Sequence, residues 1–143
     1  MSDQQVHVLF LCVANSARSQ MAEGWGRALL GDEAKISSAG SSPRGVNPYA
    51  VRVMDEVGID LTGHTSDAVD AVDPAGVSHV VTLCEEEVCP VFLGDAVRLH
   101  WPLSDPDRKD PSLPDAVCMG HFREARDAIR ALIEENRAVL LRR

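Results

Sequence analysis

The chain has 143 residues, 45% of them hydrophobic, which is enough for one globular domain with a buried core. Its formal net charge of -8 repels phosphate backbones and anionic membrane surfaces, so we expect neither nucleic acid nor a membrane as a partner. No apolar run approaches the roughly 18 residues of a membrane span, and acidic and amide residues stand where a signal peptide carries lysines. We therefore expect a cytoplasmic monomer with a single domain over residues 1–143.

The first predicted unit consists of a strand, a loop and a helix. Residues 6–11 are β-branched and apolar, as in strands buried within a parallel sheet. After a polar loop, an apolar stripe with helical spacing follows, formed by Met21, Ala22, Trp25, Ala28 and Leu29. Gly31 suits the left-handed residue that closes a helix. Residues 36–39 predict a second strand, which ends at Gly40.

The remaining chain continues this alternation. Asn47 can cap a helix that begins at Pro48, and its core stripe is formed by Ala50, Val53, Met54 and Val57. Residues 79–83 and 97–101 predict two more strands. From about Pro114, an amphipathic helix carries its apolar face at Phe122, Ala125, Ile129, Leu132 and Ile133.

This order of elements predicts the fold class. Strands that alternate with helices favour a doubly wound α/β domain, here a four-stranded parallel sheet with helices on both faces. Such sheets bind ligands beyond the carboxyl ends of their strands. Cys12 and Cys84 both follow predicted strands, and the loop after Trp101 leaves from the same edge. We therefore expect the functional groups to meet at this edge.

Four cysteines are too few and too unevenly spaced for a secreted disulfide framework: Cys12, Cys84, Cys89 and Cys118. In a reducing compartment such thiols are catalytic, redox-active or metal-binding. A zinc site is one interpretation, with the ligands Cys84, Cys89, His79 and His100. The zinc site is disfavoured because His79 lies inside a predicted strand and no second cysteine pair follows.

The stretch "CVANSARS" gives Cys12 an unusual setting. Successive backbone N–H groups and the start of the next helix carry partial positive charge, which favours both a thiolate and a tetrahedral oxyanion. Arg18 offers a planar fork for two anion oxygens, and Ser19 can donate to the sulfur. These features predict a nucleophilic cysteine, rather than a small core residue, in an oxyanion-binding loop formed by Val13, Ala14, Asn15, Ser16, Ala17, Arg18 and Ser19.

"CVANSARS" resembles the C-x5-R-S loop of low-molecular-weight protein tyrosine phosphatases and of the thioredoxin-coupled arsenate reductases that share their fold. The phosphatases carry their general acid in an Asp-Pro-Tyr-Tyr type motif, whereas this chain has Asp105 and Pro106 without the tyrosines. They also commonly have a second cysteine where Ala17 stands. The similarity to the reductases extends over roughly residues 6 to 135, through "SAG", "GVNP", "GIDLTGHTSD", "VVTLCEEEVCPVF", "LHWPLSDP" and "FREARDAI".

The resemblance implies a relay of three cysteines that reduces arsenate to arsenite. Cys12 attacks arsenic, Arg18 and the loop amides hold the oxyanion, and Asp105 protonates the departing hydroxyl. Cys84 then attacks the Cys12 adduct, which releases arsenite and leaves a Cys12–Cys84 disulfide. Cys89 attacks Cys84 in turn, and thioredoxin reduces the resulting Cys84–Cys89 disulfide.

Several alternatives remain open at this point. The four residues "EEEV" between Cys84 and Cys89 are fewer than the family usually has, so Cys118 is a second candidate for the exit thiol. The reductant is thioredoxin or a low-molecular-weight thiol. Phosphatase activity is the alternative enzymatic function, and an oxyanion-responsive binding domain is the non-enzymatic one. A mere binder, however, needs no general acid such as Asp105.

We expect no tightly bound cofactor, and the resemblance makes a potassium ion a candidate. Some reductases of this type bind potassium at positions that match Asn15, Glu23, Ser38 and Asp67. Glu23 could instead be a solvated helix residue and Asp67 a helix cap. His64 is interpreted as a structural hydrogen-bonding residue rather than a base.

Overall fold

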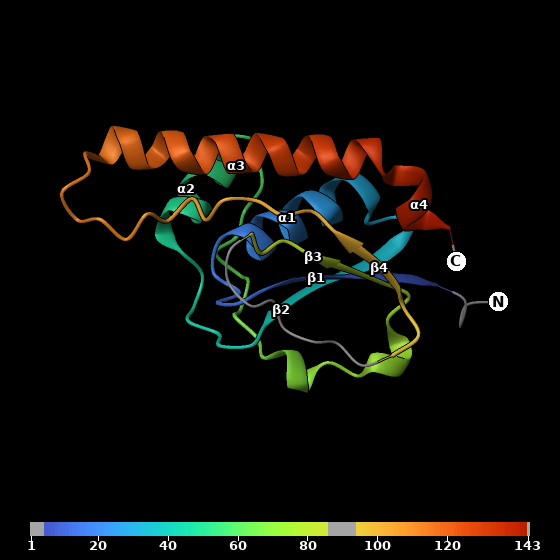
Figure 1. Cartoon of the computed structure of the whole chain (residues 1–143). Coiled ribbons are helices and arrows are strands. Elements are labelled where there is room, and N and C mark those ends of the chain that lie inside the picture. The colour runs from blue at the N-terminus through green and yellow to red at the C-terminus, as the bar shows by residue number, and fades with distance from the viewer. Residues whose placement is uncertain (1–4, 86–93, 143) are drawn as a thin grey trace.

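The computed structural model describes residues 5–85 and 94–142. Its centre is a four-stranded parallel sheet with the strand order β2-β1-β3-β4 (Figure 1). The strands are β1 (Val6–Cys12), β2 (Ala34–Gly40), β3 (His79–Thr82) and β4 (Val97–His100). The register pairs Cys12 with Gly40 and Leu11 with Thr82, so Cys12 lies at the carboxyl edge of the sheet.

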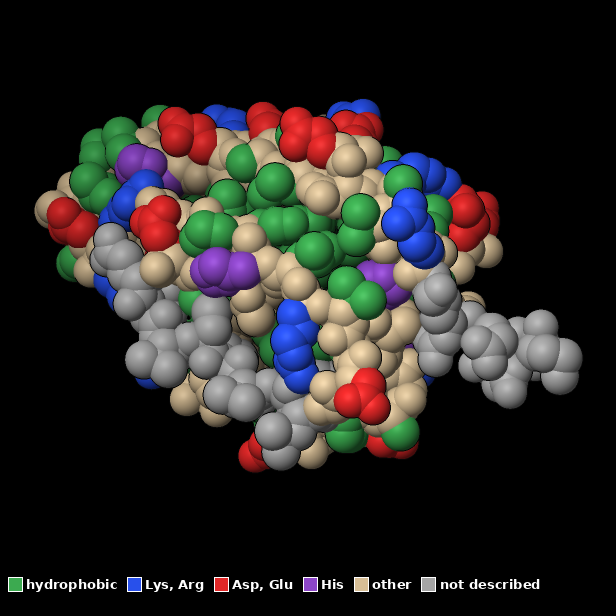
Figure 2. Space-filling model, turned by 45° about the vertical axis from the view of Figure 1, so that its right-hand side comes forward, with side chains coloured by type: hydrophobic (Ala, Val, Ile, Leu, Met, Phe, Trp, Pro, Cys, Tyr) green, Lys and Arg blue, Asp and Glu red, His purple; other side chains and the backbone are tan. Residues whose placement is uncertain are grey.

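Four α helices cover one face of the sheet (Figure 1). They are α1 (Arg18–Leu30), α2 (Pro48–Asp55), α3 (Asp115–Glu135) and α4 (Arg137–Leu141). The largest apolar core lies between these helices and β1, whose Val6, Val8 and Phe10 point into it. Figure 2 shows acidic and basic side chains side by side along the outer side of α3, as expected for an amphipathic helix.

The opposite face of the sheet is covered more thinly. Leu9 and Leu11 of β1 pack there in a small apolar cluster, next to two short 3-10 helices, η2 (Val69–Ala71) and η3 (Pro74–Gly76). The four-stranded parallel α/β class is therefore confirmed, with α helices on one face and 3-10 helices on the other. In the described part of the chain, no helix is long and apolar enough to cross a membrane.

The helix caps agree with the sequence-based prediction at Asn47 and differ from it at Gly31. The Asn47 side chain accepts a hydrogen bond from the Tyr49 N–H at 2.8 Å, with Pro48 at the first helical position, as predicted. The prediction of a left-handed Gly31 is wrong, because its φ is -60°. Glycine is needed there for space instead, since a Cβ would collide with the Arg27 carbonyl oxygen.

Candidate active site

Cys12 is buried at the end of β1, and its Sγ lies 2.9 Å from the Ser19 Oγ. The Asn15 Nδ2 donates to the same Oγ at 2.8 Å. Because the serine oxygen accepts that bond, its own hydrogen is available to the cysteine sulfur. A hydroxyl aimed at sulfur stabilises a thiolate, which is the nucleophilic form.

The backbone of the loop after Cys12 is turned so that its carbonyls face away from the site. They accept hydrogen bonds from the β2–α2 connection, with Val13 bonded to Ser42 N, Ala14 to Arg44 N and Ser16 to Asn47 N. Within the described residues, the N–H groups of residues 14–17 donate to no protein group. These N–H groups are therefore available to an anion, as in other backbone nests.

Asn15 fixes this loop conformation. Its φ of 46° lies in the left-handed region, and its side chain is fully buried. The amide donates to Ser38 Oγ at 2.9 Å as well as to Ser19, and its Oδ1 accepts from Asp67 N and Gln20 Nε2. Gly40 is required beside it, because a Cβ there would collide with the loop backbone.

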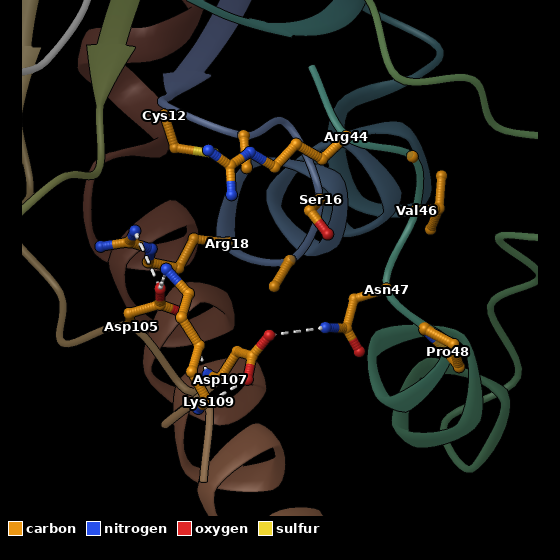
Figure 3. Close-up of a pocket in the computed structure, with 13 residues that line it drawn as sticks. Cys12, Ser16, Arg18, Arg44, Val46, Asn47, Pro48, Asp105, Asp107 and Lys109 are labelled. Carbon is orange, nitrogen blue, oxygen red and sulfur yellow. Dashed lines mark hydrogen bonds and ion pairs between the residues drawn. The ribbon is translucent and has the colours of Figure 1, made fainter. Parts of the chain in front are cut away.

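Arg18 and Asp105 face the same site from different elements. Arg18 is 4% exposed at the start of α1, and its Nη1 donates to the Leu103 carbonyl at 2.9 Å. Its Nη2 lies 3.8 Å from Asp105 Oδ2, and the Asp107 N–H donates to Asp105 Oδ1 at 3.0 Å. The loop after β4 thus holds a carboxyl group beside the arginine (Figure 3).

These groups surround a hollow of about 280 Å³, called here the Cys12 hollow (Figure 3). Its described lining consists of Cys12, Ala14, Ser16, Ala17, Arg18, residues 44–48, Asp105, Asp107 and Lys109. Asn47 Nδ2 donates to Asp107 Oδ2 at 3.3 Å and so links two of its walls. Arg44, Asn47 and Lys109 were not predicted as lining residues from the sequence. The polar composition of "SSPRGVNP" at the carboxyl edge of the sheet was the available signal.

The other cysteines are placed differently. Cys84 is buried two residues beyond the end of β3, the strand next to β1, and so lies at the same edge of the sheet as Cys12. It is not among the described residues that line the Cys12 hollow. Cys118 is half-buried on α3, beside a separate hollow with Tyr49 and Pro106. Cys89 lies outside the described residues.

The four predicted potassium ligands form one network. Asn15 donates to Ser38, whose Oγ donates to Glu23 Oε1 at 2.6 Å. Glu23, Ser38 and Asp67 line a polar hollow of about 130 Å³, called here the Glu23 hollow. Arg27 Nη2 lies 2.7 Å from Glu23 Oε2. Oxygen donors of these types suit a hard cation, so the set is compatible with potassium, although an arginine already pairs with one of its carboxylate oxygens.

The structural alternatives for these residues are wrong. Glu23 is only 7% exposed, so it is not a solvated helix residue. Asp67 is not a helix cap, because η2 begins at Val69 and has Ala68 at its cap position. His79 does not fit the role of a zinc ligand, since both ring nitrogens of this buried residue are engaged, with Ser78 Oγ and the Val139 carbonyl. Among the described residues, no group of three metal-binding side chains occurs.

His64 has the structural role that was predicted. Burial lowers its pKa, although the nearby Glu23 carboxylate opposes this change. The Gln20 amide donates to Asn15 and to the Thr65 carbonyl, so its Oε1 accepts from the His64 Nδ1 at 3.0 Å. His64 thereby orients a glutamine that supports the Cys12 loop.

The fold and the site together define a parallel α/β domain in which a buried thiol and an arginine line one hollow at the carboxyl edge of the sheet. The chain belongs to the low molecular weight phosphotyrosine protein phosphatase family, whose model matches residues 7–141.

Several proteins that the chain is similar to are named arsenate reductases. Arsenate reductase 1 of Staphylococcus epidermidis is 42% identical over 133 residues, covering 92% of this chain and 95% of that protein. The arsenate reductase of Halalkalibacterium halodurans is 44% identical over 124 residues, covering 85% and 88%. A solved arsenate reductase in a phosphate-binding state superimposes with a TM-score of 0.78 at 31% identity, over 94% of this chain and 98% of that one.

Proposed function

We propose that this protein reduces arsenate to arsenite, with Cys12 as the nucleophile. The proposal is supported by the names of its relatives and by the thiol, arginine and carboxyl group that face the Cys12 hollow. The observation that favours reduction over hydrolysis is a second buried thiol, Cys84, at the same edge of the sheet. Hydrolysis needs one thiol, whereas two-electron reduction needs two.

The first step forms a bond between sulfur and arsenic. The Cys12 thiolate attacks the arsenic atom while Arg18 and the loop N–H groups hold the oxyanion. Asp105 donates a proton to the departing hydroxyl, which leaves as water. Arsenic remains in its pentavalent state at this stage.

The second step is the reduction itself. The Cys84 thiolate attacks the sulfur of Cys12, the electron pair of the sulfur–arsenic bond passes to arsenic, and arsenite leaves. Two thiols have then become the Cys12–Cys84 disulfide, which balances the two electrons that arsenic gained. Cys89 attacks Cys84, which frees Cys12, and thioredoxin reduces the Cys84–Cys89 disulfide. A structural neighbour from Corynebacterium glutamicum is named a thioredoxin-dependent arsenate reductase, although at 24% identity it shares only the fold.

Hydrolysis of aryl phosphates is the second candidate, since its first step would use Cys12, Arg18 and Asp105 in the same way. The sole tyrosine, Tyr49, is not among the described residues that line the Cys12 hollow, and its hydroxyl donates to Asp115 on α3. We therefore rank reduction first.

We further propose that the Glu23 hollow holds a potassium ion through oxygens of Glu23, Ser38 and Asp67. Asn15, the fourth predicted ligand, would support the site through its hydrogen bond to Ser38, because its Oδ1 already accepts from Asp67 N and Gln20 Nε2. The ion would supply positive charge next to the network that supports the Cys12 loop. A cytoplasmic location and a monomeric state remain predictions.

Arsenate-dependent NADPH oxidation, coupled through thioredoxin and thioredoxin reductase, tests the proposed function. The wild type should turn over, whereas Cys12→Ser, Cys84→Ser and Cys89→Ser should each be inactive, and Cys118→Ser serves as the matched control. Activity that persists in Cys89→Ser and disappears in Cys118→Ser would transfer the exit role to Cys118. A wild type that hydrolyses aryl phosphates without reducing arsenate would overturn the proposal in favour of the phosphatase.

A further inference from the structure

A second arginine, Arg44, lies at the rim of the Cys12 hollow. Its backbone N–H donates to the Ala14 carbonyl at 3.0 Å, and Gly45 turns the chain directly after it with a φ of 87°. The connection is attached to the Cys12 loop on either side of Arg44, at Ser42 and at Asn47. The base of the arginine is therefore fixed relative to the loop. In Figure 3 its side chain extends across the hollow toward Cys12.

The two arginines that line the Cys12 hollow differ in whether their guanidinium N–H groups have partners within the protein. Arg18 is buried, donates to the Leu103 carbonyl and lies near Asp105. Arg44 is exposed, and its side chain makes no hydrogen bond or ion pair in the described part of the chain. The carboxylates that share the hollow have other neighbours, since Asp105 lies near Arg18 and Lys109, and Asp107 bonds to Asn47. All five N–H donors of Arg44 are thus available to a ligand.

The positive charge of Arg44 indicates that such a ligand is an anion. The protein as a whole carries a formal charge of -8, so an approaching anion is repelled over most of the surface. The unpaired Arg44 guanidinium at the rim attracts anions locally and so opposes this repulsion. Its planar fork matches two oxygens of a tetrahedral oxyanion, and the exposed position lets it meet the anion before the buried Arg18 does.

We propose that Arg44 is a substrate-binding residue that captures the oxyanion at the rim and then holds oxygens that Arg18 does not reach. The inference rests on the proposed function and adds the recognised class, which is doubly charged tetrahedral oxyanions, arsenate and phosphate alike. Because Arg44 binds the anion both before and during the attack by Cys12, its loss weakens binding rather than chemistry. The expected signature is a KM effect with little change in kcat.

Protection of Cys12 from alkylation by iodoacetamide tests this role without any turnover. The reagent is uncharged, and the Cys12 peptide is identified by mass spectrometry. Inorganic phosphate should protect Cys12 in the wild type, and half-protection should need about tenfold more phosphate in Arg44→Ala. Arg44→Lys should recover part of the loss. Arg108→Ala is the matched control, since it removes the same charge from an exposed residue outside the described lining of the Cys12 hollow.

The KM for arsenate should rise by the same factor of about ten in Arg44→Ala, with kcat within about twofold of the wild type. Equal shifts in Arg44→Ala and Arg108→Ala would overturn the inference in favour of a general charge effect, and so would no shift in either. Thermal unfolding establishes that the variants are folded, and Arg44→Gln, which keeps most of the side-chain length, replaces Arg44→Ala if the latter unfolds.

The outcomes also separate this inference from the proposed function. If the wild type does not reduce arsenate but phosphate still protects Cys12 in an Arg44-dependent way, the reductase proposal fails and the role of Arg44 stands. If the wild type reduces arsenate and Arg44→Ala has an unchanged KM, the role of Arg44 fails and the reductase proposal stands.

Discussion

The two sides of the Cys12 loop use their polar groups in opposite ways. On the inner side, Asn15, Ser19 and Ser38 are buried and hydrogen-bonded to one another, and no described buried side-chain nitrogen or oxygen lacks a partner. On the outer side, backbone N–H groups and the Arg44 guanidinium have no protein partner in the described residues. The hydrogen-bonded inner side therefore holds the shape of the loop, which leaves the outer side free to bind a ligand.

A change on the outer side should reduce activity without loss of stability. We expect Asp105→Asn to lower kcat for arsenate by about 100-fold or more, because the variant cannot donate a proton to the departing hydroxyl. Steady-state kinetics measure this effect, and thermal unfolding should be nearly unchanged. Asp110→Asn, an exposed carboxylate outside the described lining of the hollow, is the control. An Asp105→Asn enzyme that keeps most of its kcat would remove Asp105 from the mechanism.

A change on the inner side should reduce both stability and activity. Asn15→Ala leaves several buried groups unpaired, including the Asp67 N–H, and should lower the free energy of unfolding by about 3 kcal/mol. Asn15→Gly should lose less, because glycine adopts a positive φ without strain. Urea unfolding measures both values. Asn136→Ala, which removes one bond to the Leu132 carbonyl, should cost about 1 kcal/mol, and equal losses at the two asparagines would contradict this account.

An ion-pair cluster remote from the loop should affect stability alone, and with a defined pH dependence. Arg123, with help from Arg126, lowers the pKa of Glu56 to about 2 from its ordinary 4.5. The stabilisation is therefore complete above the unfolded-state pKa and is lost as the pH falls from about 4.5 toward 2.

Glu56→Gln should accordingly be less stable than the wild type at neutral pH, and the difference should shrink as the pH approaches 2. Chemical unfolding at several pH values measures this difference, with Glu134→Gln as an exposed-pair control that should show little change. Turnover of Glu56→Gln at neutral pH should match the wild type. A pH-independent difference would mean that Glu56 contributes through packing rather than charge.

The smallest predicted effect concerns the Glu23 hollow. Potassium chloride, compared with choline chloride at equal ionic strength, should raise the Tm by about 1 °C when potassium equals its Kd. Arg27→Ala should increase this shift, because the arginine competes for Glu23 Oε2. Glu23→Gln should abolish it. The same Tm in both salts for every variant would exclude a potassium site here.

Much of this organisation could be predicted from the sequence because it follows periodic patterns and local chemistry. The four strands, three of the α helices and the cap at Asn47 were predicted, with small shifts at their ends. The meeting of Arg18 and Asp105 followed from the rule that parallel strands place their carboxyl-end loops at one edge.

Other features depend on tertiary contacts that no local pattern shows. Gly31 was expected to be left-handed, but crowding against Arg27 is what requires glycine there. Arg44 belongs to a polar connection, and only its bond to the Ala14 carbonyl reveals that it borders the site. The 3-10 helices and α4 are too short to produce a periodic signal.

The proposed function requires that Cys12 and Cys84 together supply two electrons to arsenate. Its most direct test is a single turnover of the reduced protein with one equivalent of arsenate in the absence of any reductant, followed by thiol trapping and disulfide mapping by mass spectrometry. The account predicts one equivalent of arsenite, a Cys84–Cys89 disulfide in the wild type and a Cys12–Cys84 disulfide in Cys89→Ser. No arsenite, or arsenite formed without any disulfide at Cys84, would contradict it.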